Sequence, residues 1–120
     1  NVLITAFGRN VSPEWVETGL SAQSGVAQAV VFGDGQPTLS AVLWPVAPVV
    51  TDAQLQAAVD TANRDLPDYA RIARWTRARA AFHPDTGMAT ANGRPRRKAI
   101  EALHGDALNA PVADAAPVLS

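Results

Sequence analysis

Two apolar segments joined by a tight turn, residues 26–32 and 38–46, constrain the fold more than any other feature of the chain. The linker between them contains Asp34-Gly35, a dipeptide typical of β-hairpins, so we expect two antiparallel strands. Both faces of the second strand carry apolar side chains: Leu39, Ala41 and Leu43 on one face, Val42 and Trp44 on the other. Because both faces are apolar, the pair should be central in a sheet that is covered on both sides.

Two helices are expected beside this hairpin. Residues 51–66 form the clearer one, since Thr51 and Gln54 fit a capping box. Residues 12–22 form the other, with Ser12 as its N-cap. The side chains that these helices should bury recur at helical spacing, namely Leu55, Ala58, Val59 and Ala62 in the longer helix and Val16 and Leu20 in the shorter one.

The rest of the chain completes a small α+β domain. The further elements expected are a strand at 2–5, a turn at 8–10, a strand at 71–77, a loop at 83–87 and a helix at 94–105 that Gly105 ends. We therefore predict two to three layers, with a central three-stranded sheet, an N-terminal hairpin element and about three helices. The domain should cover residues 1–108, and residues 109–120, rich in Ala and Pro, should form a flexible tail.

Composition excludes several classes of function. The chain has no cysteine, which rules out disulfides, thiol catalysis and thiolate metal sites. Its two histidines, His83 in a loop and His104 at the end of the last helix, lie far apart in sequence, so we expect no metal site. The net charge of −1 argues against nucleic-acid binding. The tryptophans have apolar neighbours and should lie in the core rather than stack on bases: Trp15, Trp44 and Trp75.

Membrane and export signals are also missing from the sequence. No apolar run approaches the roughly 20 residues of a membrane-spanning helix. The first residues do not form a signal-peptide pattern. We therefore expect a cytoplasmic protein without a transmembrane segment, and we take the sequence for a piece of a longer protein.

The most conspicuous charged stretch is TANGRPRRKAI, residues 90–100, which sets four cationic residues behind Gly93: Arg94, Arg96, Arg97 and Lys98. Residue types alone leave two interpretations open, a solvated basic turn or an anion site in which Gly93 lets backbone approach a ligand. A third is an unrelated module that binds anionic partners through residues 94–98. The stretch FGRNVSPEWVE, residues 7–17, likewise fits either a hairpin turn feeding a helix or a backbone ridge that lines a channel.

Two stretches in the right order resemble one family. NVLITAFGRNVSPEWVE, residues 1–17, resembles the segment just after the hinge of adenylate-forming enzymes, which include acyl-CoA synthetases, nonribosomal peptide adenylation domains and luciferases. MATANGRPRRKAI, residues 88–100, resembles their last motif, Pro-x4-Gly-Lys-x2-Arg. The likeness covers the chain to about residue 105, as in that family's small C-terminal domain. The variant GRNVSPEWVE is most similar to long-chain acyl-CoA synthetases.

The resemblance implies a mobile lid with two working faces. A large N-terminal domain would bind ATP, Mg²⁺ and a carboxylic acid, here a fatty acid, and the lid alone would be inactive. First the last motif would serve acyl-adenylate formation, and the lid would then swing to bring the post-hinge turn to the site. The acceptor would be CoA or the pantetheine of a carrier protein. The residues that would line the pantetheine tunnel are Ala6, Phe7, Gly8, Arg9 and Asn10.

The last motif departs from the family pattern at its catalytic position. Gly93 and Arg97 match, but Met88 stands at the proline position and Arg94 at the lysine position. Arg94 is therefore the expected catalytic cation, although a planar guanidinium differs from a point-charge ammonium, so adenylation could be slow or lost. Lys98, one helical turn later, is not expected to replace the lysine. The alternative is an adenylation-impaired homologue that acts as a nucleotide-binding or acyl-binding regulatory module.

Overall fold

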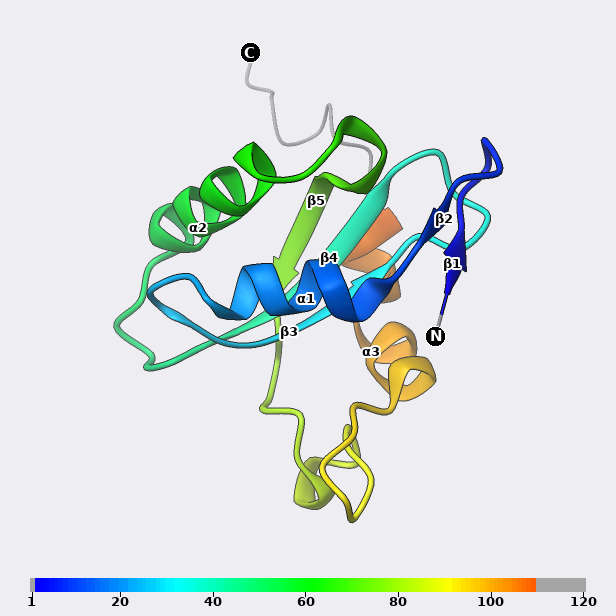
Figure 1. The fold of residues 1–120 in the computed structure, drawn as a ribbon. Coiled ribbons are helices and arrows are strands. Elements are labelled where there is room, and N and C mark those ends of the chain that lie inside the picture. The colour runs from blue at the N-terminus through cyan, green and yellow to red at the C-terminus, as the bar shows by residue number, and fades with distance from the viewer. Residues whose placement is uncertain (1, 110–120) are drawn as a thin grey trace.

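The computed structural model describes residues 2–109 and shows a small α+β domain (Figure 1). The strands are β1 (Leu3–Ile4), β2 (Asn10–Val11), β3 (Val26–Phe32), β4 (Leu39–Pro45) and β5 (Ile72–Arg77). The α-helices are α1 (Pro13–Ser21), α2 (Asp52–Arg64) and α3 (Arg97–Asn109), and two short 3₁₀ helices are η1 (Asp68–Ala70) and η2 (Pro84–Thr86). The predicted fold class is confirmed.

The central sheet has the order β3-β4-β5. The predicted hairpin is present, but only β4 is central, and β3, which was expected to be central with it, lies at an edge of the sheet. β3 and β4 are antiparallel, and Val30 is paired with Val42. β4 and β5 are parallel, with Ala41 paired with Trp75, because α2 carries the chain back to the starting edge. β1 and β2 form a separate two-stranded hairpin with Leu3 opposite Val11. The strand expected at 2–5 is thus shorter, and the expected turn at 8–10 lies at residues 5–9, since Asn10 already belongs to β2.

Helices cover both faces of the central sheet, as the two-sided apolar pattern predicts. One core joins α1 and α2 to the face that carries Leu39, Ala41 and Leu43. The other core joins α3 and the 78–88 segment to the opposite face, with Val42 buried and Trp44 partly buried. Figure 1 shows α1 in front of the sheet and α3 behind it. Three layers result, with β4 buried between the two helical layers.

The predicted helix starts are confirmed at α1 and α2. The Thr51 hydroxyl accepts a hydrogen bond from the Gln54 backbone N–H at 3.1 Å, and the Gln54 side chain accepts one from the Thr51 N–H at 2.8 Å. The Ser12 hydroxyl accepts from the Trp15 N–H at 3.4 Å. The helical residues buried by α1 and α2 include every predicted one: Val16, Leu20, Leu55, Ala58, Val59 and Ala62. Capping and apolar spacing are local signals, so the sequence predicts both helices well.

The last helix begins and ends later than predicted. Pro95 is bridged to Ala89 in an extended segment, so α3 starts at Arg97 rather than residue 94. The helix also continues through Gly105, which was expected to end it. A glycine inside a helix costs about 1 kcal/mol relative to alanine. Burial of Leu108 in the second core offsets that cost. Asn109 ends α3, and residues 110–120 of the predicted tail lie outside the described residues.

Two predictions about single side chains were wrong. Trp15 was expected in the core but is 47% exposed, because it lies on the outer face of α1 while Val16 and Leu20 face the sheet. His104 was expected only to mark a helix end but is buried at 3% exposure, because α3 continues past it. Trp44 and Trp75 are partly buried against the two cores. His83 is exposed, as expected, but residues 84–86 of the loop expected at 83–87 form η2, because His83 and Thr86 cap this short helix.

No helix within residues 2–109 is both long enough and apolar enough to cross a membrane.

Candidate functional site

Residues 89–95 of the last motif form a closed hairpin loop before α3. The Thr90 N–H donates to the Arg94 carbonyl oxygen at 2.8 Å, and the Gly93 N–H donates to the Thr90 carbonyl oxygen at 2.8 Å. The Arg94 N–H donates to the Thr90 hydroxyl at 3.2 Å. Gly93 has φ +84°, a left-handed conformation that L side chains rarely adopt. The glycine of the motif is therefore required by the turn.

Arg94 projects from this loop as an exposed side chain. Within residues 2–109, no hydrogen bond or ion pair holds its guanidinium, whereas Arg96 donates to the Gly87 carbonyl oxygen at 3.2 Å. The loop backbone is thus fixed while the Arg94 side chain extends from it. This arrangement suits a cation that meets an anionic ligand held by another domain.

Arg97 joins the start of α3 to α1. Its Nη1 lies 2.7 Å from Glu17 Oε2 and its Nη2 lies 3.0 Å from Glu17 Oε1, a bidentate ion pair. Nη2 also lies 3.4 Å from Glu14 Oε2, and Nη1 donates to the Val31 carbonyl oxygen at 3.2 Å. Glu17 in turn accepts from the Val31 N–H at 2.7 Å. One network therefore joins α1, β3 and α3.

The electrostatics of this network favour the charged arginine. Burial of the side chain is the largest single effect and lowers the pKa of Arg97. The hydrogen bond and charge of Glu17, together with those of Glu14, outweigh burial and raise the pKa of Arg97 above its usual value. The Arg97 side chain is 25% exposed and that of Glu17 12%, so solvent screens this pair only in part.

Residues 6–10, in the segment that resembles the family's post-hinge segment, form an exposed turn at the other end of the domain. The Thr5 N–H donates to the Arg9 carbonyl oxygen at 2.9 Å, and the Gly8 N–H donates to the Thr5 carbonyl oxygen at 2.9 Å. Gly8 has φ +78°, so this glycine is also required by its turn. The five predicted tunnel residues are all exposed and contiguous, namely Ala6, Phe7, Gly8, Arg9 and Asn10.

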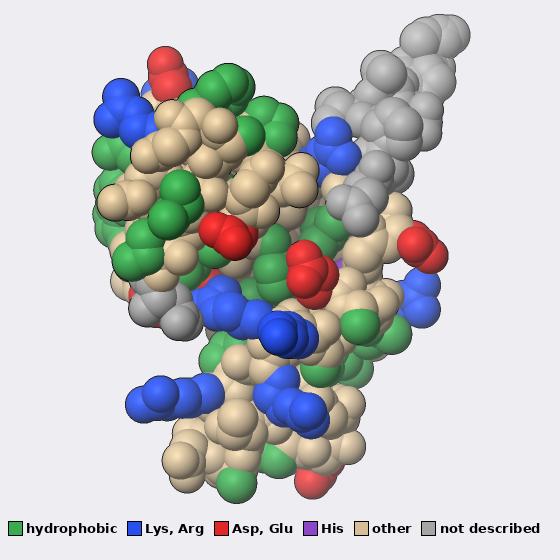
Figure 2. Space-filling model, turned by 90° about the vertical axis from the view of Figure 1, so that its right-hand side faces the viewer, with side chains coloured by type: hydrophobic (Ala, Val, Ile, Leu, Met, Phe, Trp, Pro, Cys, Tyr) green, Lys and Arg blue, Asp and Glu red, His purple; other side chains and the backbone are tan. Residues whose placement is uncertain are grey.

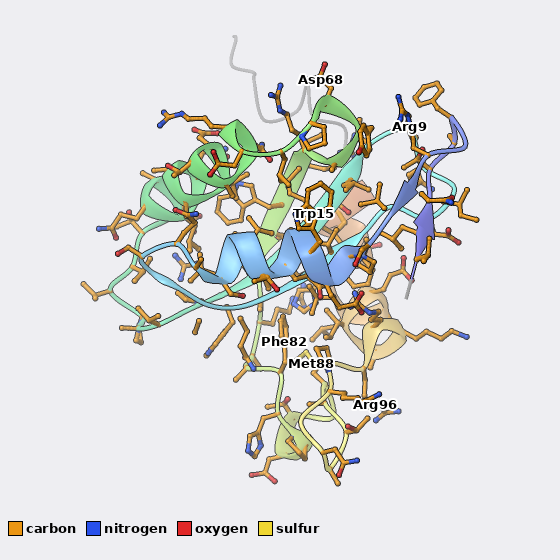
Figure 3. All side chains as sticks on the ribbon, in the orientation of Figure 1. Arg9, Trp15, Asp68, Phe82, Met88 and Arg96 are labelled. Atoms are coloured by element: carbon orange, nitrogen blue, oxygen red, sulfur yellow. The ribbon has the colours of Figure 1, made fainter. Side chains whose placement is uncertain are left out.

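The two candidate faces lie far apart on one body. Figure 1 shows the β1–β2 turn at the upper right and the loop before α3 at the bottom, and the labelled Arg9 and Arg96 lie at opposite ends in Figure 3. Figure 2 shows Lys and Arg side chains gathered at the waist and the lower lobe of the molecule. Arg94, Arg96 and Lys98 are all exposed. A single rigid orientation could not place both faces in one active site.

Lys98 faces a different part of the surface from Arg94. Its side chain lines a cleft of about 180 Å³ that also includes Leu3, Asp34 and Glu101, and Arg94 does not line that cleft. That Lys98 does not replace the motif lysine stays a prediction. Within residues 2–109, no group of three or more acidic, His or Cys side chains could hold a metal ion.

Three residues that contribute to these contacts were not predicted from the sequence. Glu17 and Glu14 were recognised only as acidic residues of a helix start, although they pair with Arg97 across the domain. Tyr69 was not singled out, although the Arg9 guanidinium lies 4.6 Å from the centre of its ring. Side chains that meet across such long stretches of chain have no characteristic spacing, so no local signal could have identified these contacts.

Comparison of the chain with known proteins identifies its family. The family model of the AMP-binding enzyme C-terminal domain matches residues 1–115. The chain belongs to this family. It is 29% identical over 122 residues to the long-chain-fatty-acid–CoA ligase FadD15 of Mycobacterium tuberculosis, a match that covers 82% of this chain and 20% of that protein. The chain thus spans about a fifth of the length of the curated relatives that it matches.

Solved structures of adenylate-forming enzymes share the fold. The A-PCP didomain of carboxylic acid reductase from Segniliparus rugosus, in complex with AMP, superposes with a TM-score of 0.78 at 23% identity, covering 98% of this chain and 18% of that one. Apo MatB from Rhodopseudomonas palustris gives a TM-score of 0.66 at 19% identity, over 90% of this chain and 21% of that one. At these identities the likeness shows the fold of the AMP-binding enzyme C-terminal domain.

Proposed function

We propose that this domain is the mobile lid of an ATP-dependent, AMP-forming acyl-CoA synthetase that acts on a fatty acid or a related carboxylate. The observation that carries the proposal is the presentation of two family motifs by fixed turns at opposite ends of one domain. Two faces on one rigid body suit two successive half-reactions with a rotation between them. The name of the relative FadD15 supports a fatty-acid substrate and CoA as acceptor. The A-PCP didomain among the structural relatives supports carrier-bound pantetheine as the other possible acceptor.

In the first half-reaction, Arg94 would stabilise the charge that develops as the carboxylate oxygen attacks the α-phosphorus of ATP. Pyrophosphate leaves and the acyl-adenylate forms. The exposed guanidinium is unpaired within residues 2–109, so it is available to oxygens of the phosphate and the carboxylate. Mg²⁺ would be held by the large domain, as the resemblance to adenylate-forming enzymes implies.

In the second half-reaction, the turn of residues 6–10 would line the channel for the thiol. The thiol sulfur attacks the acyl carbon, AMP leaves and the thioester forms. A turn that Gly8 keeps narrow allows close approach of backbone to the pantetheine chain. The Ala6 N–H donates to the Gln36 carbonyl oxygen at 2.9 Å, which holds the turn against the β3–β4 connection.

Pyrophosphate exchange into ATP tests the proposal. The full-length protein is assayed with a panel of fatty acids in its native form and as Arg94→Lys and Arg94→Ala, with Arg64→Ala as a matched control at another exposed arginine. We expect native exchange that falls at least tenfold in Arg94→Ala and changes little in Arg64→Ala, because only Arg94 would meet the developing charge. Exchange that is unaffected by Arg94→Ala would contradict the role of Arg94.

A second function is favoured by the arginine at the lysine position. A planar guanidinium cannot enter a narrow site as a point charge, so the fold could have lost adenylation and kept nucleotide or acyl binding as a regulatory module. Absence of native exchange, with exchange gained in Arg94→Lys, would select this function. Nucleotide binding by the native protein without exchange would support the same conclusion.

A further inference from the structure

Tyr69 lies outside both motif segments but contacts one of them. The guanidinium carbon of Arg9 lies 4.6 Å from the centre of the Tyr69 ring, the geometry of a cation–π contact. Tyr69 belongs to η1, which follows α2 and precedes β5, and it is 39% exposed. The contact joins the post-hinge turn to a distant part of the domain surface.

The segment that carries Tyr69 is firmly braced. Arg71 Nε donates to the carbonyl oxygens of Asn63 and Leu66 at 3.0 and 2.9 Å, and its Nη1 pairs with Asp68 at 2.7 Å. Three contacts from one arginine thus fix the connection between α2 and η1. The Tyr69 ring is therefore held on a stable platform rather than on a free loop.

The turn that contacts this platform needs lateral support. Its strands β1 and β2 are two residues long, so the ladder that holds the turn is short. One side of the turn is bound through the Ala6 N–H to the Gln36 carbonyl oxygen. Within residues 2–109, the Arg9 side is held by hydrogen bonds to Thr5, one of them from the Arg9 N–H to the Thr5 hydroxyl at 3.2 Å, and by the Tyr69 contact. Phe7 at the tip is 77% exposed.

We propose that Tyr69 is a positioning residue for thioester formation, which holds Arg9 and with it the turn of residues 6–10 at the mouth of the thiol channel. The inference rests on the proposed function of that turn. Because Tyr69 acts through Arg9, its removal should affect the thiol half-reaction and leave the adenylation half-reaction intact. The hydroxyl plays no part, since the cation contacts the ring.

The test compares Tyr69→Leu with Tyr69→Phe in the full-length protein. We expect kcat/KM for CoA to fall by about two- to five-fold in Tyr69→Leu, the loss that corresponds to one exposed cation–π contact. Tyr69→Phe should keep the native value, and pyrophosphate exchange should be unchanged in both variants. In a double-mutant cycle, Tyr69→Leu should cost little more once Arg9→Ala is present.

Several outcomes would overturn the proposal. Equal activity of Tyr69→Leu and Tyr69→Phe would show that the ring does not position the turn. Equal losses in both half-reactions, with a lowered melting temperature, would show a structural role only. A protein that forms thioesters but does not respond to Tyr69→Leu contradicts this inference alone, whereas a protein that forms no thioester with CoA or carrier-bound pantetheine contradicts the proposed function as well.

Discussion

Replacing Glu17 with glutamine tests the contact that joins the two motif segments. Glutamine has the shape of glutamate and can still accept the Val31 N–H, so the substitution removes chiefly the charge that faces Arg97. Of its two acidic partners within residues 2–109, Arg97 would keep Glu14, at 3.4 Å. The partly buried Arg97 guanidinium would therefore lose most of the negative charge that offsets the cost of its burial.

The expected magnitude follows from the geometry. Hydrogen bonds to charged groups contribute about 1.5–3 kcal/mol, and the pair lies between the exposed and the fully buried limits because the side chains are 25% and 12% exposed. We expect the free energy of unfolding to fall by about 1.5–3 kcal/mol and the melting temperature by about 6–12 °C for a domain of this size. Thermal and urea unfolding followed by circular dichroism measure both quantities.

The matched control is Asp68→Asn. It removes the acid of another arginine ion pair, but Asp68 is 93% exposed and Arg71 48%, so the melting temperature should hardly change. The pKa of Arg97 is raised from an already high value, so the stability that its charge supplies is present below that range and is lost only as pH rises through the folded-state pKa. The difference between native and Glu17→Gln should thus be constant from about pH 7 to about pH 10. If Glu17→Gln destabilises no more than Asp68→Asn, the anchoring role of this pair is wrong.

Three further substitutions test the fold around the candidate site. Gly93→Ala should weaken pyrophosphate exchange and lower the free energy of unfolding by about 1–2 kcal/mol. The reason is that alanine is strained at φ +84°, although no atom obstructs its Cβ. A free energy of unfolding equal to that of the native protein would contradict the left-handed turn. His104→Phe should lower the free energy of unfolding by about 1–3 kcal/mol, since it leaves the Arg79 N–H without its acceptor, and unchanged urea unfolding would argue against the buried histidine. Gly105→Ala should raise the free energy of unfolding by about 0.5–1 kcal/mol, because the position is helical and open around the added Cβ. A lower free energy of unfolding in this variant would mean that α3 ends at Gly105.

The outcome at His104 shows where local patterns fail. In the structure, His104 Nε2 accepts from the Arg79 N–H at 3.0 Å, so its Nδ1 carries the proton that is donated to the Ile100 carbonyl oxygen at 2.8 Å. Gly105 after it is typical of a helix end, and that pattern placed His104 at a surface terminus. Packing of Leu108 against the sheet extended the helix and buried the histidine. A tertiary contact thus overrode a local stop signal.

In the candidate site, too, some residues can be found from the sequence and some contacts cannot. The motif residues Gly8, Gly93 and Arg94 could be found from the sequence, because each motif is a short contiguous stretch whose glycine has a local backbone requirement. The pairs Arg97–Glu17 and Arg9–Tyr69 could not, because each joins segments that meet only after the sheet has formed. The roles of these residues in catalysis stay predictions until the half-reactions are measured.

The sequence by itself determined the two-sided hairpin, the capped helices and the order of the elements, because alternation, helical spacing and capping act between residues close in the chain. Only the tertiary structure decided how far α3 extends, which histidine is buried, and how the two motif turns are fixed at opposite ends of the domain. Those features depend on side chains from distant segments that share one core or one ion pair. The closing of α1 and α3 over opposite faces of the sheet creates these contacts.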